Sequence, residues 1–199
     1  MTEKRNYVMK RRAEAQDATR LKIVEAAMHL HGEVGARNTT ISAIAERAGV
    51  QRLTVYRHFP SEFEVFQACT SHWLGLNTPP DPATWAAIGD PMARAQAGIA
   101  AIYGYYGRTQ RMLALSYRDV DTVPALQQPM AELANYVAAA AAGLAAGFKR
   151  KGKAQTMLSA TLAHAVHFLT WQNLESLGLD NERKVALALA WLHGCQPNP

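Results

Sequence analysis

The chain has 199 residues, of which 49% are hydrophobic and 19% are charged. These proportions exclude wholesale disorder, and the length suffices for one large helical domain or for a small domain joined to a larger one. The net charge of +5 arises within residues 1–60, which hold eleven Lys and Arg against six Asp and Glu, whereas residues 61–199 hold ten of each. The N-terminal part is therefore the part expected to meet a polyanion, although an ordinary solvated surface would carry the same charge.

Cysteine content and apolar runs bear on location and cofactors. The two cysteines, Cys69 and Cys195, lie far apart without CxxC spacing, so neither a disulfide framework nor a structural zinc site is predicted. The N-terminal segment lacks the apolar stretch of a secretory signal, and the longest apolar run, 137–148, is too short to span a bilayer. We expect a cytoplasmic protein with no cofactor, no metal and no membrane partner.

The N-terminal segment, residues 1–16, is polar and carries five Lys and Arg. We expect a flexible basic arm there. Such an arm either reaches into the DNA minor groove, as in some helix-turn-helix proteins, or remains a solvated tail. A first helix is predicted over about 17–33, closed by Gly35.

Two short helices joined by a glycine turn are predicted next. Thr40 offers a side-chain oxygen as the N-cap of the first, and Gly49 supplies the residue able to adopt a left-handed conformation at the turn. The first helix has apolar residues at i, i+3, i+4 and i+7: Ile41, Ile44, Ala45 and Ala48. The second is predicted over 51–58, and polar residues dominate its surface.

The rest of the chain also reads as helical, so we predict an all-α fold. Ser61 and Glu64 form a capping box for a helix that runs to about Trp73. A proline-rich linker with at most a short helix around Trp85 follows over 76–91. Further helices are predicted at roughly 91–107, 109–118, 124–149, 153–177 and 181–194.

The exposed face of the helix-turn-helix carries side chains suited to DNA. Gln51, Arg52 and Thr54 lie at the N-terminal end of the second helix, where side chains that read the major groove hydrogen-bond base edges. One turn later come residues that hold phosphates and set the register. The predicted DNA-contacting set is Thr40, Ser42, Gln51, Arg52, Leu53, Thr54, Tyr56, Arg57 and His58.

Residues 39–66, TTISAIAERAGVQRLTVYRHFPSEFEVF, resemble the DNA-binding domain of TetR-family transcriptional regulators. The resemblance extends back through the first helix, so that it covers residues 17 to about 70. It rests on a Thr pair, Ile-Ala, Ala-Gly-Val, Thr-aliphatic-Tyr and His-Phe: Thr39, Thr40, Ile44, Ala45, Ala48, Gly49, Val50, Thr54, Val55, Tyr56, His58 and Phe59. One position departs from the pattern, because Glu62 stands where the family often has a Lys near the DNA backbone, and this disfavours a phosphate contact there.

The resemblance implies a three-helix DNA-binding domain, residues 17–75, joined by a helix to an effector-binding and dimerisation domain, residues 76–199. A homodimer would place its two recognition helices in successive major grooves of a palindromic operator, about 34 to 36 Å apart. It also implies a repressor that a small-molecule effector releases from its operator.

Two features of the C-terminal half support this expectation from the residues themselves. The last helix is apolar almost all round over 185–192, so it needs cover on more than one side, and with the helix before it we expect a four-helix dimer interface. A mainly apolar pocket is the second expectation. Its candidate lining is Trp85, Tyr103, Tyr106, Met112, Tyr117, Asn135, His164, His167, Phe168 and Trp171.

Alternative interpretations remain at this stage. Any single aromatic candidate is more readily a core residue than a ligand contact, although the set together favours a cavity. His164 with His167, at i and i+3, suits a pocket or core pair better than a metal site. An enzyme is not expected, because no GxSxG, HExxH, P-loop or GxGxxG motif occurs. The rival functions are a non-specific architectural DNA-binding protein and a helical small-molecule-binding protein without a regulatory role.

Overall fold

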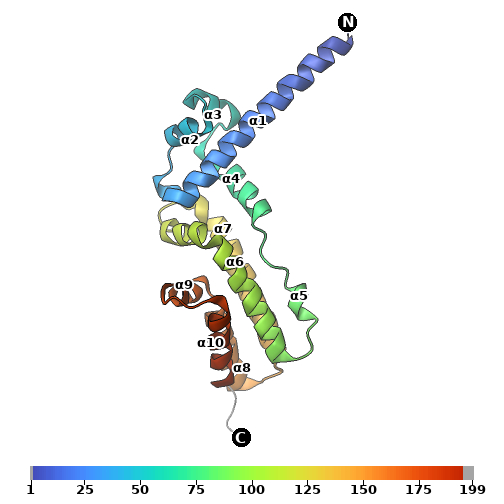
Figure 1. The fold of residues 1–199 in the computed structure, drawn as a ribbon, viewed down its shortest axis with the longest axis vertical. Helices are drawn as coiled ribbons and strands as arrows, with labels where there is room; N and C mark the ends of the chain where they lie inside the picture. Colours follow the sequence, from blue (N-terminus) through green and yellow to red (C-terminus); the bar gives the residue numbers. More distant parts are fainter. Residues whose placement is uncertain (1, 195–199) are drawn as a thin grey trace. The chain divides into compact units, whose positions relative to one another are not determined.

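The computed structural model describes residues 2–194, which contain ten α-helices, two short 3-10 helices and no strand (Figure 1). The all-α prediction is confirmed. The described residues divide into two compact units: unit 1 consists of the residues up to Asn77 together with Arg111–Pro129, and unit 2 consists of Thr78–Gln110 together with the residues from Met130 onward. The segment 111–129, which lies within the C-terminal domain predicted over 76–199, groups with the N-terminal part in unit 1. Cys195 lies outside the described residues.

The first helix is much longer than predicted. Helix α1 spans Thr2–Val34, so the expected flexible arm over residues 1–16 is helical where it is described. Residues 2–16 contain neither Gly nor Pro and are rich in Ala, Glu, Lys and Arg, so no residue stops the helix before Gly35, whose φ of 90° suits glycine alone. The exposed side chains of Tyr7 and Met9 indicate that this extension lies in solvent.

The helix-turn-helix forms as its capping residues predict. Helix α2, Ile41–Ala48, follows the 3-10 turn η1, Ala36–Asn38, and begins where the Thr40 hydroxyl oxygen accepts a hydrogen bond from the Ala43 N–H at 3.1 Å. It ends at Gly49, which is left-handed at φ 66°. Helix α3 spans Arg52–His58. Helix α4 spans Glu62–Leu76, and the Ser61 hydroxyl oxygen accepts from the Glu64 N–H at its start.

The core of unit 1 lies where α1 packs against α2 and α4. Only the second half of α1 takes part, because its buried face begins at Ile23. The buried side chains of this cluster are Ile23, Val24, Ala26, Ala27, Leu30, Ile41, Ile44, Ala45, Val55, Phe59, Val65 and Cys69. Helices α2 and α3 are too short to be stable alone, so burial of this common face holds them in place.

Helix α6 is continuous over Pro91–Asp119 and follows the short helix α5, Ala83–Ala86. The predicted break between two helices near residue 108 is wrong. Gly104 and Gly107 weaken a helix but do not stop it as a proline would, and Gly107 lies 4.0 Å, measured from an added Cβ position, from the Trp171 ring. A Cβ at Gly107 would make only an ordinary contact with that ring, so packing does not require the glycine.

The later helices are α7, Gln127–Ala146, after the 3-10 turn η2, Pro124–Leu126, then α8, Gly152–Ala165, α9, Phe168–Ser176, and α10, Asn181–Gly194. The single helix predicted over 153–177 is wrong, because it breaks between α8 and α9. The His167 side chain accepts a hydrogen bond from the Leu169 N–H and caps α9. A new helix therefore starts at this break.

The carbonyl groups freed by that break are satisfied from α6. The hydroxyl of Tyr103 donates to the Ala165 carbonyl at 2.7 Å, and the hydroxyl of Tyr106 donates to the Val166 carbonyl at 2.8 Å. Burial raises the pKa of Tyr103, which keeps its hydroxyl protonated as a donor. Two buried tyrosines of one helix thus stabilise a break in another.

Candidate nucleic-acid interface

The second helix of the helix-turn-helix, α3, presents a mixed surface to solvent. Gln51, Arg52 and Leu53 at its start are exposed, and 70% of the Leu53 surface is free. Val55 is fully buried and fixes the helix on the core of unit 1. The exposed start therefore offers an amide, a guanidinium and an apolar side chain together, which are the types that contact adenine, guanine and the thymine methyl group.

Arg52 is held by a neighbour one turn away. Its Nη2 donates to the Tyr56 hydroxyl at 3.3 Å, and its guanidinium lies 5.6 Å from the centre of the Tyr56 ring. The pKa of Arg52 is raised, chiefly by this hydrogen bond. Tyr56 thus restricts the arginine that sits at the tip of α3. Arg57 is exposed, whereas Thr54 and His58 are half-buried.

The threonines before α2 have different uses. The Thr40 oxygen accepts from the Ala43 N–H, so its own proton remains available to another acceptor. The Thr39 hydroxyl donates to the Gly35 carbonyl at 2.8 Å and is thereby committed within the protein. Ser42, in the first turn of α2, is exposed.

Arg20 on α1 anchors the other end of α3. Its Nη1 donates to the His58 carbonyl at 2.8 Å, and its guanidinium lies 4.0 Å from the centre of the Phe59 ring. A cation that accepts no hydrogen bond but donates to the last carbonyl groups of a helix also interacts favourably with the negative end of the helix dipole. Arg20 was not among the predicted site residues. Its sequence position shows only a basic residue on the polar side of a helix, and the contact depends on the tertiary fold.

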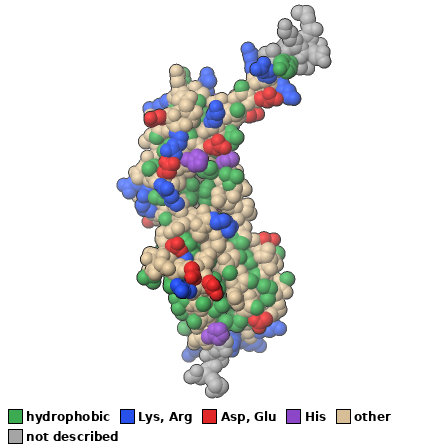
Figure 2. Space-filling model, viewed as in Figure 1, with side chains coloured by type: hydrophobic (Ala, Val, Ile, Leu, Met, Phe, Trp, Pro, Cys, Tyr) green, Lys and Arg blue, Asp and Glu red, His purple; other side chains and the backbone are tan. Residues whose placement is uncertain are grey.

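Basic side chains continue along α1 away from this anchor. Lys10, Arg11 and Arg12 are exposed, and Figure 2 shows Lys and Arg side chains along the outer part of this helix. Because α1 is helical there, its charges are displayed on a rod and not on a flexible arm. The basic residues could still contact the minor groove or remain in solvent, as the two interpretations of this segment have it, but they do so from a helix and not from a flexible arm.

A buried carboxylate closes unit 1 at the end of α1. Asp119, with 1% of its surface exposed, accepts from the Arg37 backbone N–H at 3.1 Å and pairs with Arg118, which holds the pKa of Asp119 below its usual range. Nη2 of Arg118 also donates to the Val34 carbonyl at 2.9 Å. The end of α6 therefore binds the end of α1 through the backbone around Gly35.

The predicted effector-contacting residues do not form one set. Tyr106, Phe168 and Trp171 pack with ring centres 5.3 to 5.9 Å apart in the core of unit 2, where Trp85 and Tyr103 are also buried. The remaining predicted residues are distributed elsewhere: Met112 and Tyr117 in unit 1, and Asn135, His164 and His167 on unit 2 outside this core.

A cavity of about 390 Å³ lies in unit 2, beside the break between α8 and α9. Of the predicted set it includes His164 and His167, whose neighbours there are Trp191 and Thr170. The His164 and Trp191 ring centres lie 5.7 Å apart.

No helix within residues 2–194 has the length and apolar character needed to cross a membrane.

The helix-turn-helix is similar to a described family of proteins. Residues 23–69 match the sequence model of the family "Bacterial regulatory proteins, tetR family". The chain is 38% identical over 82 residues to two HTH-type transcriptional regulators of Pseudomonas putida, SrpR and the uncharacterized TtgW. Each alignment covers 38% of this chain, and it covers 38% of SrpR and 60% of TtgW, so less than two thirds of either relative is matched.

The similarity of fold extends further than the similarity of sequence. A TetR-like transcriptional regulator from Rhodococcus sp. RHA1 superposes with a TM-score of 0.59, covering 87% of this chain and 93% of that protein at 17% sequence identity. At this identity the match concerns the fold alone, which consists of an N-terminal helix-turn-helix followed by further helices.

Proposed function

We propose that this chain, whose residues 23–69 match the tetR family of bacterial regulatory proteins, binds a palindromic operator as a homodimer and represses transcription until a small-molecule effector releases it. The observation that carries the proposal is the exposed start of α3, with Gln51, Arg52 and Leu53 in solvent while Val55 is fixed in the core. The proposed place of action is the cytoplasm, where bacterial operators lie.

We divide the DNA contacts between bases and phosphates. Gln51, Arg52, Leu53 and Thr54 are assigned to base edges, because the N-terminal residues of a recognition helix enter the major groove. Phosphates are assigned to the hydroxyl and cationic groups around them: Thr40, Ser42, Tyr56, Arg57 and His58. Support of Arg52 by Tyr56 lowers the conformational freedom that the arginine loses when it binds a base.

The dimer is assigned to α8 and α10. Each carries an exposed apolar side chain, Met157 on α8 and Leu187 on α10. Ala186, also exposed on α10, permits close approach of a second helix. Two such helices from each subunit form a four-helix interface about a two-fold axis.

The effector is assigned to unit 2. The aromatic residues of its core are packed together, whereas the cavity at His164, His167 and Trp191 offers polar groups on an apolar wall. An effector there would act by binding the operator-free form of the dimer more tightly than the operator-bound form.

Selection from random duplex DNA tests sequence recognition. The wild-type protein is expected to enrich a palindrome, and Arg52→Ala is expected to lose preference at one position in each half-site, at a cost of about 1–3 kcal/mol for the correct base. Arg108→Ala removes an exposed arginine of unit 2 and serves as the matched control. Equal affinity for the selected palindrome and for random DNA at one salt concentration would contradict a regulator and support an architectural protein.

The dimer has its own test. Leu187→Glu is expected to yield a monomer in size-exclusion chromatography with light scattering, because the charge would be buried between copies. Leu177→Glu, at a more exposed leucine outside α8 and α10, is expected to leave the oligomeric state unchanged. A Leu187→Glu protein that remains dimeric would place the interface elsewhere.

A further inference from the structure

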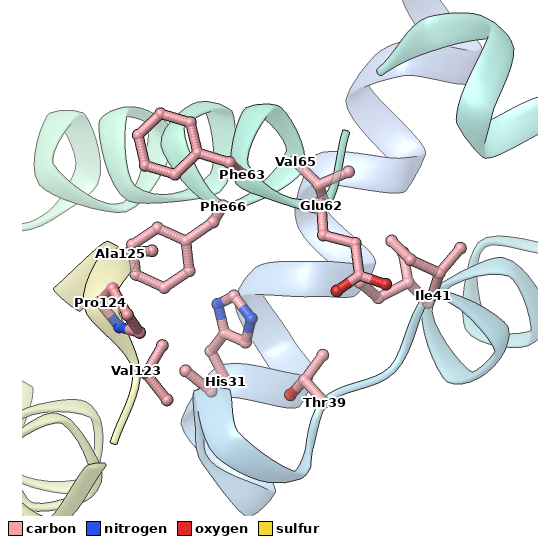
Figure 3. Close-up of a pocket in the computed structure, with 12 residues that line it drawn as sticks. His31, Thr39, Ile41, Glu62, Phe63, Val65, Phe66, Val123, Pro124 and Ala125 are labelled. Carbon is pink, nitrogen blue, oxygen red and sulfur yellow. The ribbon is translucent and has the colours of Figure 1, made fainter. Parts of the chain in front are cut away.

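A cavity of about 300 Å³ lies within unit 1, beside the helix-turn-helix. His31 on α1, Thr39 and Ile41 at the start of α2, and Phe66 on α4 line it, and the segment 123–125 closes the remaining side (Figure 3). Most of its wall is apolar. Its volume falls at the lower end of the range of about 300 to 1,000 Å³ that is typical of small-molecule sites.

His31 gives this apolar cavity a polar group. Its ring lies at the centre of the view in Figure 3, and only 8% of its surface is exposed. Nδ1 lies 3.1 Å from the Cys69 Sγ, while Nε2 has no hydrogen-bond partner among the described residues. Every side-chain nitrogen or oxygen that is fully enclosed in the described part of the chain has a hydrogen-bond partner. Because Nε2 has none, it is not fully enclosed, and we take it to be accessible from the cavity that His31 lines.

The protonation state of His31 is set by burial. Burial lowers the pKa of its imidazole to about 4, against which the negative charge of Asp119 acts weakly. Burial also raises the pKa of the Cys69 thiol to about 12. A neutral ring and a neutral thiol therefore share one hydrogen bond, and Nε2 remains available to a polar group of a ligand.

Glu62 places a carboxylate at the edge of the same cavity. Its side chain is exposed and lines the wall beside Ile41 (Figure 3). This is the residue that departs from the family pattern, and DNA binding offers no reason for it. The guanidinium of the nearby Arg52 donates a hydrogen bond to the Tyr56 hydroxyl. The aromatic side chains of Phe63 and Phe66 stand on the same helix, and Phe63 is half-exposed.

We propose that this cavity binds a small aromatic amine, whose ring contacts Phe63 and Phe66 while its ammonium group pairs with Glu62 and His31 Nε2 accepts or donates one hydrogen bond. The negative charge of Glu62 selects a cation over an anion of the same shape. Aromatic rings favour both the ligand ring and a nearby cation. The proposal does not rest on repression or on dimer formation, because every residue it uses belongs to unit 1.

Phenethylamine and phenylacetate are the probes for this site, because they share a ring and differ in charge. With the full chain and about 10 mM probe, phenethylamine is expected to raise the Tm by a few degrees and phenylacetate is expected not to. Amide chemical shifts are expected to change at residues around His31, Thr39 and Phe66. Equal effects of both probes, or shifts confined to unit 2, would overturn the proposal.

Two variants separate the site from general effects. Glu62→Gln is expected to weaken phenethylamine binding by about threefold or more, whereas Glu64→Gln, two residues further along the same helix and outside the cavity, is expected not to. Ala125→Phe fills the cavity and is expected to abolish binding. Unchanged phenethylamine affinity in Ala125→Phe or Glu62→Gln would also overturn the proposal, while leaving operator recognition by α3 unaffected.

Discussion

The ends of short helices are stabilised by different kinds of contact in the two units. In unit 1 the ends of α2 are fixed by residues next to it, Thr40 at the start and Gly49 at the end. In unit 2 the start of α9 is capped locally by His167, but the carbonyl groups at the break after α8 accept from the hydroxyls of Tyr103 and Tyr106, about sixty residues away in sequence. Local capping can be recognised in a sequence, whereas a contact between distant residues cannot. The contrast explains where sequence-based prediction succeeds in this chain.

Unit 1 also contains contacts between distant residues, and the one around Gly35 predicts the largest effect. Gly35 has φ 90° and ψ 161°, and an added Cβ would lie 2.4 Å from the Asp119 Oδ2 and 2.2 Å from the Arg118 Nη2. Gly35→Ala is therefore expected to lower the free energy of unfolding by about 4 kcal/mol, from backbone strain together with displacement of the buried carboxylate. Urea denaturation measures it.

Gly49→Ala is the control, because Gly49 also has a positive φ but an added Cβ meets nothing within 4 Å. Strain alone is expected to cost about 1–2 kcal/mol there. If the two substitutions destabilised the protein equally, the contact with α6 would contribute nothing, and unit 1 would depend on local signals alone.

The next effect concerns pH and His31. Burial lowers its pKa from 6.5 to about 4 in the folded protein, so between these values the unfolded chain binds more protons than the folded one. The free energy of unfolding is therefore expected to fall as pH drops from 6.5 to about 4, by about 3 kcal/mol in total. Asp119, whose pKa is lowered from 3.8, contributes to stability that is lost only below this window.

Two measurements test this expectation. Chemical denaturation at several pH values gives the slope, and an NMR titration of the His31 ring gives its pKa directly. His31→Leu is expected to flatten the slope between pH 6.5 and 4. A ring that titrates near 6.5 in the folded protein would contradict it.

The elements of unit 1 could be predicted because their signals lie within a few residues of each helix end. The exposed start of α3 follows from the same signals, since Val55 and Phe59 alone can face inward. Three features could not be predicted: the role of Arg20 at the end of α3, the break at His167, and the anchor at Asp119. Each depends on a side chain that meets backbone far away in sequence. The polar sequence of residues 2–16 predicts a flexible arm, but polarity alone does not end a helix, and neither Gly nor Pro occurs there.

A smaller effect tests the distant contacts of unit 2. Tyr103→Phe leaves the Ala165 carbonyl without its donor, so the free energy of unfolding is expected to fall by about 1–3 kcal/mol. Tyr105→Phe is the control, because Tyr105 is equally buried on the same helix but its hydroxyl has no hydrogen-bond partner among residues 2–194. Equal losses for the two variants in urea denaturation would mean that the hydroxyl of Tyr103 does not stabilise the break after α8.

The smallest effect isolates local capping. Thr40→Ala removes the oxygen that accepts from the Ala43 N–H, and it is expected to cost about 1 kcal/mol of unfolding free energy. Thr40→Ser keeps the oxygen and is expected to restore most of that loss. If Thr40 also donates its proton to a phosphate, Thr40→Ala weakens operator binding at temperatures far below the Tm, while Thr40→Ser does not. A loss of stability without a change in operator affinity would mean that Thr40 only caps the helix. This pair of variants therefore separates the structural role of Thr40 from a role in DNA binding.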